Sequence, residues 1–445
     1  MMMNIQADKI EHWLEHHPNI TFAGHELDWL NQQRQNALSA LEQIGLPSVR
    51  DEQWRYTNLR ALKSNAYAPS SLSEDTLSSK TQQSLNLILE KTTSEAIMVF
   101  INGHFSKEFS NFTSLGHGVV LTNTAHALQH HSDKLESTFN SSVESYEHGF
   151  SALNTAYFQD GFTLLLPENT HSENTIETIF ISTQLSQDAL PVSHNRNLIV
   201  AGSNAKITVV ERHIGSDGEV YLNNSITEII AGNNAHVDHY KLQQESNDAF
   251  HIGGVFIKQA AHSNVKNHNI GLSGLVVRND VSSSLEGQGA HNEMNGLVMG
   301  KDRQHFDNHT QVNHQVAHCT SDEYYKSILD DHSRSVFRGR IIVAQDAQQT
   351  NADQQNNNLL LSDNAEADTK PQLEIYADDV KCSHGATVGQ LDKKSLFYLQ
   401  SRGIDRQSAI ALLTFAFANE VIDRINIDSL QQELTQLIAG ELLQA

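Results

Sequence analysis

Short runs of alternating apolar and polar residues fill the middle of the chain and predict extended β-structure. From about residue 175 these runs become regular, as in residues 177–183, 197–213 and 226–244, and turns rich in glycine and asparagine separate them. The turn sequence Gly-Ser-Asn-Ala-Lys-Ile at Gly202 returns as Gly-Asn-Asn-Ala-His-Val at Gly232, an offset of about 30 residues. A fixed offset of this size predicts stacked coils with three short strands each, and therefore a mainly β fold with a right-handed parallel β-helix as its core.

The distribution of proline and of polar residues supports the β-helix. The chain has six prolines, and none lies between Pro191 and Pro371. This suits a sheet in which every backbone N–H is needed for the ladder. The tract rich in asparagine and glutamine at residues 348–358 is expected to be ordered, because such side chains can stack on neighbouring coils. A β-sandwich has a similar alternating pattern and is the competing interpretation.

Helical periodicity marks the N-terminal part of the chain. Apolar residues recur at helical spacing between residues 27 and 44, and Gly45 and Pro47 predict the end of that segment. The aromatic and charged stretch 51–62 is expected to be a docking or capping segment. The stretch 70–84 is rich in serine and threonine and weakly apolar, which predicts a flexible connector.

Three helices are expected at the C-terminal end. Their predicted N-caps are Asp392, Asp405 and either Asp428 or Ser429. The first helix would bury Leu396, Phe397 and Leu399. The second is apolar around much of its circumference, so it is either buried on several sides or meets a partner. These patterns divide the chain into an N-terminal helical region (1–95), a β-helix core (96–390) and a C-terminal helical region (391–445).

The crossing from the last strand pattern to the first of these helices carries the first candidate for chemistry. Strand spacing places Cys382 and His384 on one face, together with Val380, Ala386 and Val388. A thiolate and an imidazole there can bind a soft metal or carry sulfur. Two ligands cannot close a four-coordinate site, so a metal function needs residues from elsewhere in the fold or from a second chain. The plainer interpretation is a buried thiol beside a surface histidine.

A second candidate is the group His305, His309, His314 and His318 with Cys319. Strand alternation puts His314 and His318 on one face, and Cys319 on the other face with His305 and His309. This division favours polar strand and loop positions over a metal site. A ligand role for these residues is the alternative.

The composition narrows the function classes. The chain has 30 basic and 53 acidic residues and a net charge of −23, which opposes binding to nucleic acid or to an anionic membrane. Two cysteines cannot form a disulfide framework, the N-terminus lacks a secretory signal pattern, and no run approaches the ~20 apolar residues of a membrane span. A cytoplasmic location is therefore expected. The absence of P-loop, dinucleotide and nucleophile-elbow motifs argues against a self-contained nucleotide-using or hydrolytic enzyme.

The C-terminal third resembles a known family, the SufB/SufD components of the Suf iron–sulfur cluster assembly machinery. The resemblance lies in DVKCSHGATVGQLDKKSLFYLQSRGI (residues 379–404), in LLTFAFANEVIDRI (412–425) and in the stretch 337–379 before them. The segments DEQWRYTNL (51–59) and ALNTAYFQDG (152–161) are similar to the SufD branch. SufB proteins usually carry additional upstream cysteines, which are lacking here.

The resemblance implies a non-catalytic scaffold that pairs with a SufB-type subunit through the last β-helix strands. His384, and less strongly Cys382, would face a SufB cysteine where a nascent cluster or iron is held between the chains. The C-terminal helices would dock a SufC-type ATPase; the candidate docking residues are Leu412, Leu413, Phe415, Phe417 and Glu420. The family also implies a role in iron supply and a reduced flavin in the assembled complex.

Other interpretations of the fold and of the histidines remain open at this point. A homodimer is plausible for the isolated chain, because edge strands can pair with a second copy. A homodimeric metal-binding β-helix protein is one alternative function. A β-helical carbohydrate-active enzyme with paired carboxylates is a less favoured one.

Overall fold

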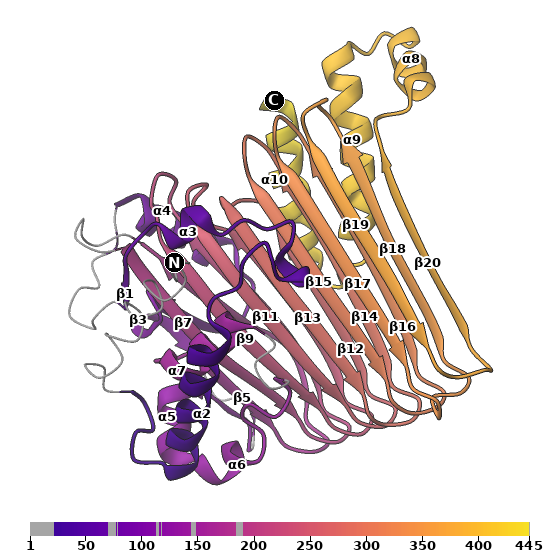
Figure 1. The fold of residues 1–445 in the computed structure, drawn as a ribbon. Coiled ribbons are helices and arrows are strands. Elements are labelled where there is room, and N and C mark those ends of the chain that lie inside the picture. Colours follow the sequence, from indigo (N-terminus) through magenta and orange to yellow (C-terminus); the bar gives the residue numbers. More distant parts are fainter. Residues whose placement is uncertain are drawn as a thin grey trace, which may run out of the picture.

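The computed structural model describes residues 22–69, 77, 79–112, 115, 116, 118–143, 148–183 and 190–444. Its centre is a long stack of strands, with helices at both ends (Figure 1). The elements before the regular stack are α2 (Asp28–Ile44), η2 (Glu52–Trp54), α3 (Arg60–Lys63), β1 (Tyr67–Pro69), α4 (Ser79–Lys91), β2 (Ala96–Ile101), β3 (His104–Phe112), β4 (Val120–Asn123), α5 (Thr124–His130), α6 (Ser132–Glu136), α7 (Gly149–Tyr157) and β5 (Phe162–Leu166).

The stack is a parallel β-solenoid in which successive strands alternate between two sheets. An odd sheet has the order β19-β17-β15-β13-β11-β9-β7-β5-β4, and an even sheet has the order β20-β18-β16-β14-β12-β10-β8-β6-β2-β3. The parallel β-helix prediction is thus confirmed. The solenoid strands are β6 (His171–Ser182), β7 (Leu190–Ala201), β8 (Lys206–Gly215), β9 (Leu222–Ala231), β10 (His236–Gln244), β11 (Phe250–Gln259), β12 (Asn264–Gly271), β13 (Val276–Leu285), β14 (His291–Gly300), β15 (His305–His314), β16 (Thr320–Leu329), β17 (Arg334–Val343), β18 (Asn351–Leu360), β19 (Glu366–Ile375) and β20 (Lys381–Gly389).

Each coil contains two long strands, so the expectation of three short strands was wrong. Most solenoid strands have about ten residues, and two such strands with their turns fill a period of about 30 residues. The period itself is confirmed by the register, in which His236 of β10 pairs with Lys206 of β8. Sequence alternation did not show where one strand ends and the next begins within a coil.

The asparagines of the repeated turns account for the sequence repeat. Asn169, Asn204 and Asn234 occupy equivalent turns and have φ values of 59°, 58° and 54°. Asparagine adopts this left-handed conformation more readily than most residues. The Asn204 amide donates to Asn169 Oδ1 at 2.9 Å, and the Asn234 amide donates to Asn204 Oδ1 at 3.1 Å. The turns therefore stack as a side-chain ladder along one edge of the solenoid.

The interior of the solenoid is apolar beside this row of turns and polar beside the opposite row. Val209, Ile229, Val237 and Val255 belong to a buried cluster on the apolar side. The other side buries charged and amide side chains, among them Glu211, His213, Asn223, Lys241, Glu245 and His251. Burial of so many polar groups requires that they pair with one another.

The N-terminal segments cover the outer face of the odd sheet. Trp54 is 2% exposed and packs with Phe150 and with Val192 of β7. The guanidinium carbon of Arg278 lies 3.9 Å from the centre of the Trp54 ring, and the Thr57 hydroxyl donates to Asp307. The stretch 51–62 is thus a docking segment, as predicted. The connector prediction for 70–84 was wrong from Ser79 onward, where α4 begins; residues 70–76 and 78 lie outside the described part.

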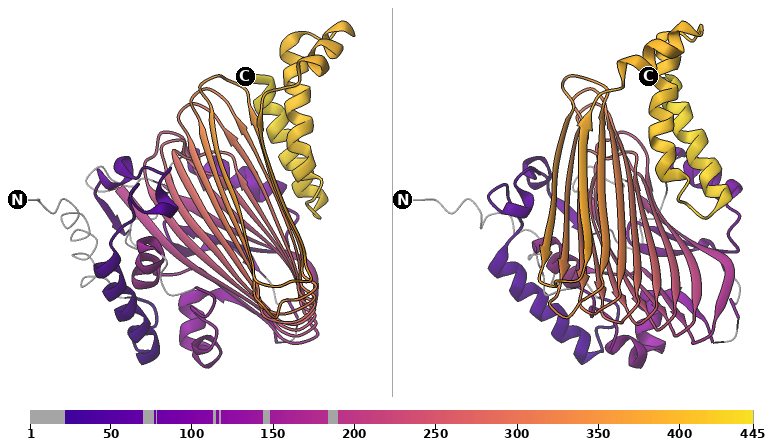
Figure 2. Two further views of the ribbon diagram at one scale, coloured as in Figure 1. Left: turned by 45° about the vertical axis from the view of Figure 1, so that its right-hand side comes forward. Right: turned by 90° about the vertical axis from the view of Figure 1, so that its right-hand side faces the viewer.

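The C-terminal helices are α8 (Lys393–Ser401), α9 (Arg406–Ile422) and α10 (Asp428–Gln444). The cap predictions are confirmed for Asp392, which accepts the Lys394 and Ser395 N–H groups, and for Asp405, which accepts the Ser408 N–H. Helices α9 and α10 pack on the outer face of the even sheet, and α8 projects beyond it (Figures 1 and 2). Among the described helices, none combines the length and the apolar character needed to cross a bilayer.

The prediction of a buried Phe397 was wrong. Its side chain is 72% exposed, and no residue of α8 is buried. Helix α8 contacts mainly α9 and has no sheet beneath it. Its apolar residues therefore lack the surface that the helical pattern led us to expect.

Candidate functional site at the open end of the solenoid

The last coil leaves both sheets open at the same end of the molecule. Strands β19 and β20 are the terminal strands of their sheets, and no other described strand pairs with their outer edges (Figure 2). Tyr376 directly follows β19 and is 64% exposed, and Val388 on β20 is 47% exposed. An open edge of this kind is a template for pairing with another chain.

The hydrogen-bond directions show which backbone groups face outward. The Lys381 N–H donates to the Thr350 carbonyl in the turn before β18. Because successive residues of a strand turn their N–H groups to opposite sides, the N–H groups of Cys382, His384 and Ala386 face the open edge. On β19 the Glu366 N–H donates inward to the Ser333 carbonyl. By the same alternation, an N–H at position 371 would face the open edge, and this position is occupied by Pro371. Proline is tolerated there because no ladder bond inside the protein is lost.

Cys382 and His384 lie on β20 and share one strand face, as predicted, and this face is turned to the inside of the last coil. Cys382 is in register with Ala352 of β18, and His384 is in register with Gln354. Both partners on β18 are buried inside the solenoid, and directly paired residues of neighbouring strands share a face. His384 is exposed because no further coil covers it.

The thiol of Cys382 is in a different environment from the imidazole. It is half-buried against the apolar interior. Burial raises the pKa of the Cys382 thiol, although the Ala352 N–H partly opposes this. The thiolate is the form that ligates metals. His384 is therefore the more exposed ligand of the two.

A column of polar side chains leads inward from His384. Below it, the Gln354 amide donates to Glu323 Oε2 at 3.0 Å, and the Thr310 hydroxyl donates to the same oxygen at 2.6 Å. Burial raises the pKa of the Glu323 carboxyl to about 7. Sequence patterns did not single out Gln354 and Glu323. The repeat of about 30 residues could have identified them, because Gln354 is in register with His384 and Glu323 is in register with Gln354.

The two predicted site residues do not form a metal site by themselves. Within the described part of the chain, no third histidine, cysteine, aspartate or glutamate converges with Cys382 and His384. The pair meets solvent at an open sheet end, where a second chain can add ligands. The geometry fits a site that is completed between two chains.

The histidines at 305–318 do not converge on one another. His305 and His309 lie outside the odd sheet, where they contact Thr57 and Asp307 at 2.9 and 3.0 Å. His314 lies inside the solenoid and contacts the Ser321 hydroxyl at 2.9 Å. Cys319 is buried inside as well, so the prediction that it shares a face with His305 and His309 was wrong. The left-handed turn at His318, with φ of 64°, resets the alternation between the two strands.

The predicted docking residues on α9 lie in two different environments. Phe415 and Phe417 pack partly against the even sheet. The Glu420 carboxylate pairs with the Lys326 ammonium at 2.7 Å and accepts the Tyr324 hydroxyl at 2.6 Å, so it ties α9 to β16. Leu412 is 50% exposed and Leu413 is half-buried. On α8, which contacts α9, Phe397 and Tyr398 are 72% and 56% exposed.

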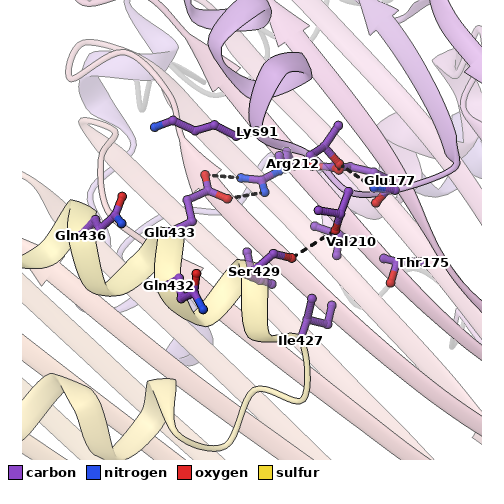
Figure 3. Close-up of a pocket in the computed structure, with 14 residues that line it drawn as sticks. Lys91, Thr175, Glu177, Val210, Arg212, Ile427, Ser429, Gln432, Glu433 and Gln436 are labelled. Atoms are coloured by element: carbon purple, nitrogen blue, oxygen red, sulfur yellow. Dashed lines mark hydrogen bonds and ion pairs between the residues drawn. The ribbon is translucent and has the colours of Figure 1, made fainter.

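A pocket of about 330 Å³ lies where α10 meets the even sheet (Figure 3). The Arg212 guanidinium crosses it, with two hydrogen bonds of 2.9 and 2.7 Å to Glu433 and one to Glu177. Burial acts to lower the pKa of Arg212, but the two carboxylates reverse this and raise it. Because these charges satisfy one another, the pocket is best explained as the anchor of α10.

Comparison with known proteins identifies the family to which the chain is similar. Residues 181–417 match the SufBD core domain of SUF system FeS cluster assembly, and residues 3–178 match the SufBD protein N-terminal region. An iron–sulfur cluster assembly SufBD family protein of Synechocystis is 33% identical over 94% of this chain and 92% of its own length. The iron–sulfur cluster assembly protein SufD of Escherichia coli is 30% identical over 92% of each chain. The chloroplastic protein ABCI7 of Arabidopsis thaliana is 29% identical over 93% of this chain and 86% of its own.

The two family matches together span nearly the whole chain, and the core match alone covers more than half of it. The matched core contains the solenoid strands from β7 to β20, the strand that carries Cys382 and His384. It also contains most of α9. The chain belongs to the SufBD family of the Suf iron–sulfur cluster assembly system.

Proposed function

We propose that this chain is a non-catalytic scaffold subunit in which His384 helps to hold a nascent cluster or iron at the junction with a SufB-type subunit. The observation that carries the proposal is the position of His384. It stands on the terminal strand and faces the interior of an open coil, and the described residues of its own chain do not complete a ligand set around it. A partner that continues both sheets would cover this coil and add its own ligands.

The partner would pair with the outward-facing N–H and C=O groups of β19 and β20. Strand addition uses main-chain hydrogen bonds for affinity and side chains for specificity. The same edges can pair with a second copy of this chain when no SufB-type subunit is present. Iron supply and a reduced flavin belong to the assembled complex in this proposal.

A SufC-type ATPase would dock on the surface formed by Phe397, Tyr398 and Leu412. Three exposed apolar residues on two neighbouring helices are unusual for a surface that stays in water. Glu420 and Phe417 would transmit movement, because both fasten α9 to β16 through Lys326. ATP-driven movement of the ATPase would thus reach the strands below α9.

The pairing is tested with a proline on the open edge. Ala386→Pro removes an outward N–H and leaves the inward bonds of β20 in place, so the variant should fold and lose the SufB-type subunit in co-purification. Ala386→Ser keeps the N–H and should retain the subunit. His384→Ala should also retain it, because its backbone is unchanged. Retention of the subunit by a folded Ala386→Pro variant would contradict pairing through β20.

A further inference from the structure

A buried cluster near the start of the solenoid has the composition of a metal site. His213 at the end of β8, Glu245 in the turn after β10 and His251 on β11 bring ligand atoms within 4.8 Å of one another. All three side chains are almost fully buried. Among the described residues, these three are the group of histidine, cysteine, aspartate or glutamate side chains whose possible ligand atoms all lie this close together. Two imidazoles and one carboxylate suit divalent ions of the first transition series.

The hydrogen bonds of His213 present one nitrogen to this cluster as a lone pair. Its Nε2–H donates to Glu211 at 2.7 Å, and its Nδ1 accepts the Asn223 amide at 2.9 Å. Metal-bound histidines commonly donate their other ring N–H to a carboxylate, which fixes the tautomer and the ring orientation. Glu211 has that relation to His213.

The Asn223 amide occupies the place where a cation would lie. Its nitrogen donates both to His213 Nδ1 and to Glu245 Oε1, the latter at 3.2 Å. This N–H donor therefore bridges two acceptors, one on β8 and one in the turn after β10. Rotation of the amide by half a turn would replace this donor with Oδ1, an oxygen ligand.

The remaining contacts hold His251 beside Glu245. His251 Nδ1 lies 2.8 Å from Glu245, and its Nε2 accepts from the Lys241 ammonium at 2.9 Å. Glu245 thus contacts both His251 and the Asn223 amide, and the same amide contacts His213. These contacts bring the three ligand side chains together around Asn223.

We propose that His213, Glu245 and His251 bind one divalent first-row transition-metal ion, with Asn223 Oδ1 as a fourth ligand and Glu211 as a positioning residue. On binding, Lys241 gives up His251 and keeps its bond to Asn279, which is 3.0 Å long in this structure.

This site is separate from His384 at the open end. Strands β10, β12, β14, β16 and β18 lie between β8 and β20. At the usual spacing of strands, the two sites are about 30 Å apart. The inference therefore stands independently of the proposed cluster-assembly role.

The test uses Co²⁺ as the probe and the full chain. The chain is stripped with a chelator in sub-denaturing urea, returned to buffer with Co²⁺, and examined for visible d–d absorption and bound metal per chain. We expect one Co²⁺ per chain, displaced by Zn²⁺. His213→Gln and Glu245→Gln should weaken binding about 100-fold or more, and Glu211→Gln about 10- to 100-fold.

Two further variants distinguish loss of the metal site from loss of the fold. His314→Gln changes a buried histidine outside the cluster and should keep full binding. Asn223→Asp supplies a charged oxygen, so it should bind Co²⁺ about tenfold more tightly and gain more thermal stability from it than the unchanged chain. No stoichiometric uptake by the unchanged chain would overturn the proposal. Equal binding by a folded Glu245→Gln variant, or weaker binding by Asn223→Asp, would also overturn it.

Discussion

Glu323 makes the stability of this protein depend on pH in a direction opposite to that of most paired carboxylates. The side chain is 1% exposed inside the solenoid, and burial raises its pKa from 4.5 to about 7. The folded chain therefore holds a proton between these values that the unfolded chain releases. The contribution to stability is fully present below pH 4.5 and is lost as the pH rises through 7. A difference of 7 − 4.5 = 2.5 pH units corresponds to about 3 kcal/mol.

Glu323→Gln should remove this dependence. The glutamine side chain resembles the protonated acid in shape, and its amide oxygen can accept the same bonds from Thr310 and Gln354. Urea unfolding at pH 5 and pH 8 measures the free energy of unfolding of both proteins. We expect the loss between the two pH values to be about 2.5 kcal/mol smaller in the variant, because part of the contribution is already lost at pH 5. Glu136→Gln, at an exposed position of α6, is the control and should leave the loss unchanged. An equal pH dependence in Glu323→Gln and the unchanged chain would refute the reasoning.

Three other substitutions test separate parts of the account. Trp54→Ala should lower the free energy of unfolding by about 3–5 kcal/mol in urea titrations, because it opens a cavity over the odd sheet and removes the Arg278 contact. A smaller loss of unfolding free energy in Trp54→Ala than in Trp54→Phe would contradict this. Asn234→Ala should cost about 1–2 kcal/mol in the same assay because of the left-handed turn, whereas Asn234→Gly should cost less. Phe397→Asp should abolish co-purification of a SufC-type ATPase, and Leu443→Asp, at another exposed apolar position, should not; the same result for both variants would remove the α8 surface from the proposal.

Much of the fold could be predicted because the solenoid repeats its own sequence. Turn residues such as Asn204 and Asn234 recur wherever the chain needs a left-handed conformation, and this repetition exposes the period. The number of strands per coil could not be predicted, since alternation of apolar and polar residues continues through polar interior positions. Phe397 was misplaced for a related reason. A helical pattern gives the apolar face of α8 but not what lies opposite it.

The candidate site was predictable only as far as a single strand extends. Strand alternation was sufficient to put Cys382 and His384 on one face. Contacts across coils, such as that of Gln354 with Glu323, depend on register, which local patterns do not contain. The cluster of His213, Glu245 and His251 has no motif spacing, because its ligands come from two sheets and a turn. The run at 305–318 has a more compact spacing, yet alternation along β15 puts His305 and His309 outside the solenoid and His314 inside it.

The central claim is that His384 helps to hold a cluster between this chain and a SufB-type subunit. The most direct measurement is the iron and sulfide content of the complex reconstituted from both subunits and the SufC-type ATPase. His384→Ala should assemble the same complex but lose most of its iron and sulfide. Cys382→Ala should lose less, and His332→Ala, which changes an exposed turn histidine away from β20, should lose none. Full iron and sulfide in an intact His384→Ala complex would contradict the claim.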